Sequence, residues 1–472
     1  MKVYFYHTQD LNMIQKRWKE GHFPAHYLYG ATHLPKYGVD VVMHKHKAIS
    51  NRFQLMLYVT WRVFTCREHF DAIYATHFNG LELIIFLRAL HLYMKPVIIW
   101  HHQPIVKADN SFREMMAKIF YKGIDHMFFF SEALINESLK SSKAKESRME
   151  VCHWGADLES YDRLMKEYPV EKHEGFISTG KEKRDMPTLI RAFSATGQEL
   201  NIYIAYNACG DNYLEILNDL RPSSNIHINF IKGLIPNELA QKVWASKCVV
   251  ISCQETNYTV GLTTLVEALA LGLPVISTRN VTYPFDIEKE GVGIVVPYYD
   301  SVAWEKAIRF IVNNPAEAEA MGKKARALAE KLYNLDNCSR EVADAVKRFE
   351  KKRSEKPVRE HDHDVEAAEI SHETPSKPKE KTSDLDTELG GERKVLFGET
   401  LSTNQHSHSI INKEEVYARM KLLSKKFPAL EQAKNLLPEK ELVMELVDKT
   451  KSAVKRGYQW IAKQIDDYKN QE

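Results

Sequence analysis

One stretch of this sequence places a glycine directly before a helical run, an arrangement suited to binding phosphate. In TVGLTTLVEALALGLPVIS, Gly261 precedes a run of apolar residues with helical spacing. A glycine there lets phosphate oxygens approach backbone N–H groups, and the helix N-terminus adds a partial positive charge. We therefore expect Gly261, Leu262 and Thr263 to bind a diphosphate. The same run carries Glu267, which we expect to face inward because leucines and alanines flank it.

A second stretch, GFISTGKEKRDMPTLIRAF, places basic residues in a turn between a strand-like run and a helical run. Lys181 and Arg184 follow Gly180 there, and we expect them to meet the same phosphates. Cations fixed beside phosphate groups stabilise their negative charge without a metal ion. On composition alone, the alternative is an exposed charged turn. The place of this turn, after a strand and a glycine, favours the phosphate interpretation.

We expect no metal ion and no bound cofactor. The Asp-x-Asp matches, at 362–364 and 384–386, lie in a polar stretch where paired carboxylates are usually solvated charges.

Histidines follow two strand-like runs in the first half of the chain. The segment FDAIYATHFNG places His77 after one run, and IIWHHQPI places His101 and His102 after another. Open α/β sheets bind ligands at the carboxyl ends of their strands, where an imidazole can hydrogen-bond a hydroxyl group of the ligand. His102 and His77 are therefore our catalytic candidates. His101 is the alternative inward-facing residue, and a structural role is the alternative for each of them.

These residues need parallel sheets to position them, and the sequence alternates short apolar runs with longer helical ones, as βαβ units do. The expected strands span residues 3–7, 39–43, 72–76, 97–100 and 126–130, and then 175–178, 201–205, 226–230, 248–252, 274–277 and 292–295. The fold class is therefore α/β, with two Rossmann-like domains facing a cleft. The apolar stretch 81–100 contains Arg88 and Lys95, so we expect a buried helix and a strand rather than a membrane span.

The composition divides the chain into four segments. We expect Rossmann-like domains at 1–160 and 161–350, separated by a strand-free hinge that contains Pro169. Residues 351–411 are rich in Lys, Glu, Ser, Pro and Asp, which predicts a disordered linker. Residues 412–472 regain helical spacing and predict a helical appendage with an apolar face.

Overall composition matches an ordinary globular protein. Of the 472 residues, 44% are hydrophobic and 27% charged, and the formal net charge of +2 gives no general reason to expect nucleic acid as a partner. The six cysteines have no ligand-like spacing, which indicates reduced thiols. The sequence MKVYFYHTQD lacks the features of a signal peptide, so we expect a cytoplasmic protein, or one at the membrane periphery.

The order of strand, Gly261, helix with Glu267, and Gly-x-Pro-Val-Ile strand resembles the nucleotide-sugar-binding core of glycosyltransferase family 4 (glycosyl transferases group 1), which has the GT-B fold. The resemblance implies that Glu267 binds the ribose, and that Lys181 and Arg184 occupy the family's basic positions. It also places Gly30 where the family has a glycine-rich loop after its first strand. Thr259 stands where the family has a second glutamate that contacts the donor sugar.

The resemblance implies transfer of a sugar from a UDP- or GDP-linked donor to an acceptor hydroxyl, with retention of configuration, in glycan or polysaccharide biosynthesis. A glycan or a lipid-linked molecule is the expected acceptor. The alternative is a catalytically degenerate GT-B scaffold or binding protein whose helical tail recruits a partner or membrane. For the amphipathic tail itself, membrane contact, partner binding and packing on the rest of the chain all remain open.

Overall fold

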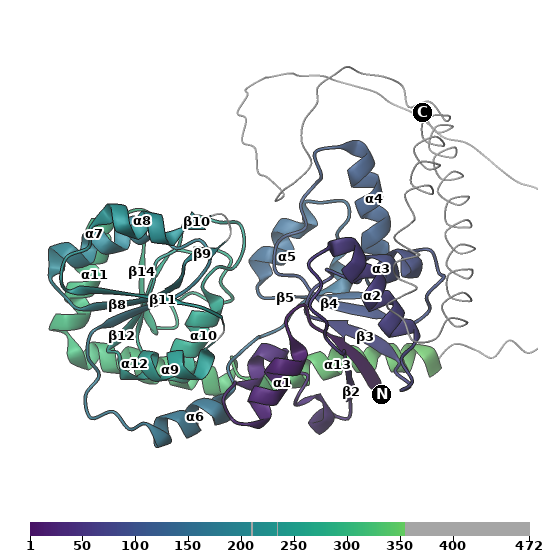
Figure 1. Cartoon of the computed structure of the whole chain (residues 1–472), viewed down its shortest axis with the longest axis horizontal. Helices are drawn as coiled ribbons and strands as arrows, with labels where there is room; N and C mark the ends of the chain where they lie inside the picture. The colour runs from purple at the N-terminus through teal and green to yellow at the C-terminus, as the bar shows by residue number, and fades with distance from the viewer. Residues whose placement is uncertain (209–210, 234, 355–472) are drawn as a thin grey trace, which may run out of the picture. The chain divides into compact units, whose positions relative to one another are not determined.

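A computed structural model describes residues 1–208, 211–233 and 235–354, which lie within one compact unit, Met1–Pro357. Each half of this unit contains a six-stranded parallel sheet with flanking helices (Figure 1). The predicted linker and appendage at 351–411 and 412–472, with both Asp-x-Asp matches, lie outside the described residues except for the last turn of a helix that ends at Ser354.

The first sheet has the strand order β2-β1-β3-β4-β5-β6, and every pairing in it is parallel. All residues of β3, β4 and β5 are buried, as expected for central parallel strands. The strands are β1 (Lys2–Tyr6), β2 (Asp40–Met43), β3 (Ala72–Ala75), β4 (Val97–Trp100), β5 (His126–Phe129) and β6 (Met149–Val151).

The second sheet has the order β11-β8-β7-β12-β13-β14 and is also parallel throughout. Its chain order reverses between β7 and β12, the kind of switch point at which open sheets bind ligands. The strands are β7 (Phe176–Gly180), β8 (Leu200–Ala205), β11 (Ile226–Ile231), β12 (Cys248–Ile251), β13 (Val275–Thr278) and β14 (Gly293–Val296), with a separate antiparallel pair formed by β9 (Asn207–Ala208) and β10 (Asp211–Asn212).

Helices cover both faces of the second sheet: α7, α8 and α11 lie on one face, and α9, α10 and α12 on the other (Figure 1). The first-half helices are α1 (Leu11–Lys19), α2 (Arg52–Phe64), α3 (Glu82–Ala89), α4 (Ser111–Lys122) and α5 (Glu132–Leu139), with short 3-10 turns η1 (Ala25–Leu28), η2 (Leu34–Tyr37) and η3 (Glu146–Arg148). The later helices are α6 (Leu158–Glu167), α7 (Met186–Thr196), α8 (Tyr213–Leu220), α9 (Pro236–Ala245), α10 (Leu262–Ala270), α11 (Ser301–Asn313), α12 (Pro315–Lys331) and α13 (Leu335–Ser354).

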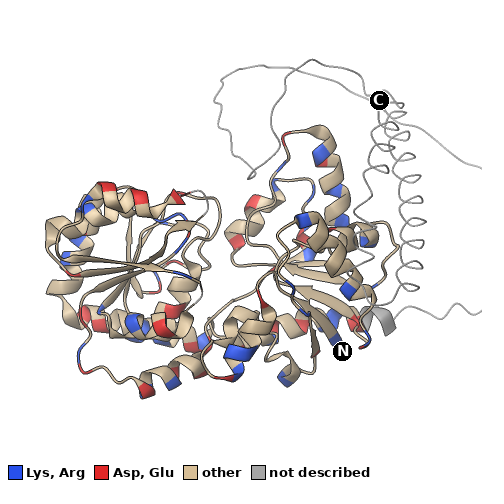
Figure 2. Ribbon diagram, viewed as in Figure 1, with Lys and Arg blue, Asp and Glu red and all other residues tan. Residues whose placement is uncertain are grey.

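Every strand expected from the sequence is present, with ends that differ by at most two residues. The apolar stretch 81–100 forms α3 and β4, as predicted, and no helix in the described part of the chain is long and apolar enough to cross a membrane. The sequence did not predict β6 or the β9–β10 pair. Acidic and basic residues are interspersed along the helices of both halves (Figure 2).

The last described helix, α13, follows the second half in sequence but contacts residues of the first. Ser339 Oγ donates a hydrogen bond to the carbonyl oxygen of Gly30 at 3.2 Å, and the Met1 amino group lies 3.7 Å from Glu350 Oε1. The helix α13 thus connects the end of the second half to the first half. Gly30, in turn, does not lie in the loop directly after β1; it follows η1 and packs against α13.

Candidate functional site

No side chain of the described residues caps the N-terminus of α10 by a hydrogen bond. Gly261 is its N-cap, with φ of +90°, and the first backbone bond of the helix runs from Leu265 N–H to Gly261 O at 2.9 Å. The N–H groups of residues 262–264 therefore have no partner within the helix. A Cβ at Gly261 would lie 2.6 Å from Ile251 Cγ2 and 2.7 Å from the Tyr283 hydroxyl, so only glycine fits. The geometry suits an anion at this position.

The loop between β7 and α7 lies beside this helix start. Thr179 Oγ1 lies 3.1 Å from Thr264 Oγ1, which ties the end of β7 to the first turn of α10. Arg184 also forms an antiparallel bridge with Cys253, in the segment after β12. The structure thus brings Lys181, Arg184 and the 261–263 segment to the same carboxyl-terminal edge of the second sheet.

Arg184 is buried, with 4% of its surface exposed, and its guanidinium holds this loop in shape. Nε and Nη2 donate to the carbonyl oxygen of Thr179 at 3.3 and 3.1 Å, while Nη1 donates to Glu182 O at 3.0 Å and to Cys253 Sγ at 3.3 Å. Four of the five guanidinium N–H groups are therefore used inside the protein. No carboxylate pairs with Arg184 in the described part of the chain, so its positive charge is not neutralised by an acid.

Lys181 is exposed, so the predicted alternative of an exposed charged residue describes its surroundings. Between the two predicted cations lies Lys183, whose Nζ is 3.3 Å from Asp211 Oδ2. The Tyr213 hydroxyl accepts the backbone N–H of Arg184 at 2.8 Å. No local pattern in the sequence indicates these last two contacts, because they join the loop to a separate segment around β10.

Glu267 is buried on α10, as expected from its flanking residues, with 7% of its surface exposed. Burial raises the pKa of its carboxyl from 4.5 to about 7, although a hydrogen bond from Tyr161 acts in the opposite direction. The Tyr161 hydroxyl donates to Glu267 Oε1 at 3.2 Å. Glu267 lies six residues after Gly261, about 9 Å along the helix axis. A helix start and a buried carboxylate are therefore held at a fixed separation.

The hydroxyl of Thr259 is engaged within the protein. Thr259 Oγ1 donates to Thr282 O at 3.1 Å. Thr282 is fixed in turn by Asn280, whose Oδ1 accepts its N–H at 2.9 Å and its hydroxyl at 2.7 Å. The loop therefore presents no carboxylate at this position.

At the first sheet, His77 and His102 lie together at the carboxyl ends of β3 and β4, with ring centroids 5.8 Å apart. His77 Nδ1 accepts the Asn79 N–H at 3.0 Å, so the proton of neutral His77 is on Nε2. His102 donates to the backbone of Thr76, and its Nε2 is buried without a hydrogen-bond partner among the described residues. In this pair, His77 Nε2–H is therefore a hydrogen-bond donor and His102 Nε2 is an acceptor.

Both histidines are neutral at physiological pH. Burial lowers the pKa of His102 to about 3, with nearby His77 acting in the same direction, and burial lowers the pKa of His77 to about 4. His101 has both nitrogens engaged, with Nδ1 2.6 Å from Gln103 O and Nε2 2.8 Å from the Tyr121 hydroxyl. Of the adjacent pair, His102 is thus the residue with an unused nitrogen.

Sequence reasoning missed His7, which directly follows β1 at the same edge. Its ring contacts Tyr29 at 5.9 Å, and Tyr29 stacks on His102 with centroids 5.9 Å apart. His7 Nδ1 accepts the Gln9 N–H at 2.9 Å. The sequence indicated His7 as the last residue of the expected strand 3–7, whereas β1 ends at Tyr6 and leaves His7 directly after the strand.

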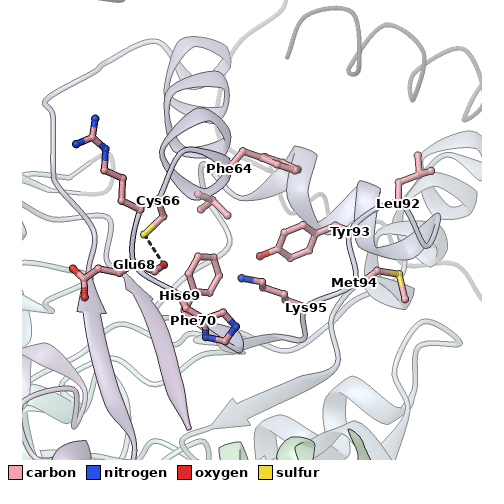
Figure 3. Close-up of a pocket in the computed structure, with 11 residues that line it drawn as sticks. Phe64, Cys66, Glu68, His69, Phe70, Leu92, Tyr93, Met94 and Lys95 are labelled. Atoms are coloured by element: carbon pink, nitrogen blue, oxygen red, sulfur yellow. Dashed lines mark hydrogen bonds between the residues drawn. The ribbon is translucent and has the colours of Figure 1, made fainter. Parts of the chain in front are cut away.

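A hollow of about 510 Å³ lies at the opposite edge of the first sheet, before β3 and β4 (Figure 3). It is lined by Val63, Phe64, Cys66, Arg67, Glu68, His69, Phe70, Leu92, Tyr93, Met94 and Lys95. Lys95 Nζ lies 3.6 Å from the centroid of the Phe70 ring. None of the predicted site residues lines this hollow, so the candidate site lies elsewhere.

The second half is similar to a known protein family. Residues 172–328 match the family model of glycosyl transferases group 1. This segment contains Lys181, Arg184, Gly261 and Glu267, so the phosphate-side candidates all lie inside the matched region. A search of curated protein sequences found no match.

Solved structures show the fold of the whole described region. Sucrose-phosphate synthase from Thermosynechococcus elongatus superimposes with a TM-score of 0.56 at 15% identity, covering 74% of this chain and 99% of that one. HepE of Anabaena, in complex with UDP-glucose, gives a TM-score of 0.52 at 14% identity, covering 74% and 100%. A glycosyltransferase from Rickettsia africae gives 0.51 at 15%, covering 74% and 98%. The two halves together have the GT-B fold.

Among the described residues, no group of three or more His, Cys, Asp or Glu side chains is placed to hold a metal ion. The candidate site consists of two sets of groups: the helix start, cations and carboxylate of the second half, and the histidine pair of the first sheet. Neither histidine makes a direct hydrogen bond or ion pair with the first set in the described part of the chain.

Proposed function

We propose that this chain is a retaining glycosyltransferase that moves a sugar from a UDP- or GDP-linked donor to an acceptor hydroxyl. The observation that carries the proposal is the buried Glu267 on the helix that begins at Gly261, within the segment that matches glycosyl transferases group 1. Burying a carboxylate costs free energy unless it is hydrogen-bonded, and a ribose can supply two hydroxyl donors to it.

The phosphate groups of the donor bind at the start of α10 and beside the β7–α7 loop. Backbone N–H groups of Leu262 and Thr263 donate to the diphosphate, and the helix dipole favours its charge. As the glycosidic bond breaks, the diphosphate gains negative charge. The uncompensated guanidinium of Arg184 and the exposed Lys181 stabilise that charge, so the transfer proceeds without a metal ion.

The histidine pair serves the sugar or the acceptor. His102 Nε2 accepts a hydrogen bond from a hydroxyl, while His77 Nε2–H donates one, and both remain neutral across the physiological range. Among the residues that the structure describes, we assign no carboxylate pair as the nucleophile and acid of a double displacement. We therefore assign to these residues the binding and orientation of the substrates.

UDP-glucose is the first donor to test. HepE was solved with UDP-glucose, and a trehalose-6-phosphate enzyme of E. coli with TM-score 0.51 was solved with UDP-2-fluoro glucose. These complexes describe those proteins, and they support UDP as the first base to examine here. A glycan or a lipid-linked molecule is the proposed acceptor class, and peripheral association with a membrane is the proposed location.

A thermal-shift panel of UDP, GDP, ADP and their common sugar conjugates tests the proposal. A ligand that binds only the native state raises its unfolding temperature. We expect one base to stabilise the wild-type protein, and Lys181→Ala and Glu267→Ala to reduce that stabilisation. Release of free nucleotide from the sugar conjugate, assayed with and without a chelator, then tests turnover and metal independence. If no nucleotide stabilises the protein, the proposal is wrong.

Thr259 supports a second candidate function, a GT-B protein that binds its ligand without turnover. Its hydroxyl is committed to Thr282 O, so neither a carboxylate nor a free hydroxyl contacts the donor sugar from this position. Stabilisation by a nucleotide sugar without its hydrolysis or transfer to any acceptor would favour this candidate. Turnover would exclude it.

A further inference from the structure

Glu267 accepts a hydrogen bond from a tyrosine that lies neither on α10 nor in the second sheet. Tyr161 lies on α6, in the segment between the two sheets, and its hydroxyl donates to Glu267 Oε1 at 3.2 Å. The tyrosine is 3% exposed, so its hydroxyl has no access to bulk water as an alternative partner. A polar contact between two buried groups 106 residues apart is a specific feature of the fold.

The position of Tyr161 is itself fixed by the first half of the chain. Its ring stacks on His26, with centroids 6.0 Å apart. Asp157, the N-cap of α6, accepts the Ala25 N–H at 2.8 Å and the Ser160 N–H at 3.2 Å. These contacts fix the helix that carries Tyr161 against the 3-10 turn η1. The hydrogen bond from the tyrosine hydroxyl in turn fixes the position of the Glu267 carboxylate.

Two tyrosines interact with Glu267 from the elements around it. Tyr161 lies on α6, and Tyr27 lies on η1. Arg326 of α12 binds Asp162 at 2.7 Å and the Ala270 carbonyl at 2.7 Å, so its charge is already paired at the far end of α10. Tyr161 is the group in the described region that hydrogen-bonds the carboxylate directly.

We propose that Tyr161 is a positioning residue for the nucleotide sugar: it holds Glu267 Oε1 so that the ionised carboxylate presents its remaining acceptor sites to the ribose. This inference rests on the proposed function. A carboxylate has about four lone-pair sites, so one bond from tyrosine leaves acceptor capacity for two hydroxyls. The same bond favours the charged carboxyl, which is the better acceptor.

A structural role for Tyr161 makes a different prediction from a positioning role. If the tyrosine only fills space, Tyr161→Phe changes nothing or weakens binding whether or not Glu267 is present. If it acts through the carboxylate, its effect disappears when Glu267 is replaced. A double-mutant cycle with Glu267→Gln separates these cases.

The experiment measures the affinity of the full chain for UDP-glucose by calorimetry, from about pH 6 to about pH 8, a range centred on the pKa of Glu267. GDP-glucose replaces it if the panel above identifies GDP. We expect Tyr161→Phe to weaken binding about tenfold at neutral pH, since a hydrogen bond to a charged group has that order of effect. In the Glu267→Gln background the same change should have an effect below about twofold.

The pH dependence provides a second readout. Wild-type affinity should rise with pH as Glu267 ionises near its pKa of about 7. Removing the tyrosine donor moves the midpoint of that rise to higher pH, because the bond had favoured the ionised form. His77 and His102 stay neutral throughout this range and do not contribute to it.

Tyr333→Phe is the matched control, since Tyr333 is also 3% exposed but its hydroxyl donates to a backbone carbonyl, Pro284 O, at 3.4 Å. We expect it to bind as the wild type does. If Tyr161→Phe binds normally, or is weakened equally in both backgrounds, the positioning role is wrong while the proposed function stands. If the wild-type chain binds no nucleotide sugar, the proposed function fails and this inference fails with it.

Discussion

At the scale of single residues, Glu267 shows a conflict between binding and stability. The folded protein surrounds this carboxyl with apolar neighbours on α10, and burial raises its pKa from 4.5 to about 7. The folded state therefore prefers the protonated form, whereas a ligand with hydroxyl donors prefers the ionised form. A residue kept for stability alone would not need to be charged here.

The stability of Glu267→Gln relative to the wild type should therefore depend on pH. Because the folded-state pKa is raised, its stabilising contribution is fully present below about pH 4.5 and is lost as pH rises through about 7. Glutamine stays neutral, so the variant should be more stable than the wild type at pH 8, by on the order of 3 kcal/mol. Urea unfolding at pH 5 and pH 8 measures the difference. An equal difference at both values would contradict the assigned burial effect.

Gly261 makes a second prediction at this scale, because it combines a positive φ with a crowded position. Gly261→Ala places a Cβ 2.6 Å from Ile251 Cγ2 at φ of +90°. Gly197→Ala is the control, since Gly197 has φ of +68° but no atom within 4 Å of the added Cβ. Backbone strain of roughly 1–2 kcal/mol is common to both, and overpacking adds about 1–3 kcal/mol at Gly261 only. The thermal midpoint of Gly261→Ala should therefore be lower than that of Gly197→Ala. Only Gly261→Ala should lose nucleotide-sugar binding.

At the scale of elements, the hydrogen bonds of Arg184 hold the β7–α7 loop in its conformation. The guanidinium bridges Thr179, Glu182 and Cys253, so it links the end of β7 to the segment after β12. Lysine cannot replace this bridge, because its donors radiate from one point instead of forming a planar fork. Lys181 lies in the same loop but is exposed. Substitution of Arg184 should therefore lower the free energy of unfolding more than substitution of Lys181.

Arg184→Lys should lower the free energy of unfolding by about 2–3 kcal/mol, since several hydrogen bonds to a charged group are lost. Lys181→Ala should change it by less than about 0.5 kcal/mol, as expected for an exposed side chain. Both variants should bind the nucleotide sugar more weakly. Thermal unfolding and calorimetry on the same preparations check this. A loss of stability in Lys181→Ala, or none in Arg184→Lys, would contradict the loop geometry.

The sequence predicted the elements better than it predicted the contacts between them. Central strands such as β4 are short runs of buried apolar residues, which a parallel sheet makes easy to identify. The edge strand β6 has three partly buried residues, Met149–Val151, and therefore no such run. The bond between Tyr161 and Glu267 joins residues 106 positions apart, so no local spacing could indicate it. Arg184 was identified as a cation, but its burial depends on carbonyl groups that the sequence does not distinguish.

At the scale of the whole described unit, α13 joins the end of the second half to the first. Glu341 lies on this helix, and its carboxylate accepts the His153 N–H and the His153 side chain, each at 2.8 Å. Cys338, one turn earlier, places its Sγ 3.8 Å from that of Cys152. The helix is thus fastened to the segment that follows β6, so changes in these contacts should affect the unfolding of the described unit.

Glu341→Gln tests this fastening through its pH dependence. Burial alone would raise the pKa of Glu341, but the hydrogen bonds from His153 outweigh it and hold the pKa below 4.5. A depressed folded-state pKa contributes stability above pH 4.5 that is lost as pH falls through the folded-state value. The variant should therefore be less stable than the wild type at pH 7, by about 1.5–3 kcal/mol. The difference should shrink toward pH 4.

Glu319→Gln is the matched control for this last prediction. Glu319 also has a lowered pKa, because Lys323 binds it at 2.6 Å on the surface of α12, but it is exposed and joins no other element. Solvent screens such a pair, so its loss should change the unfolding temperature less than the loss of Glu341. Thermal scans at pH 4 and pH 7 compare the unfolding temperatures of the wild type and the two variants. Equal effects of the two substitutions would show that α13 is not held through His153, and that its other contacts with the first half carry the connection.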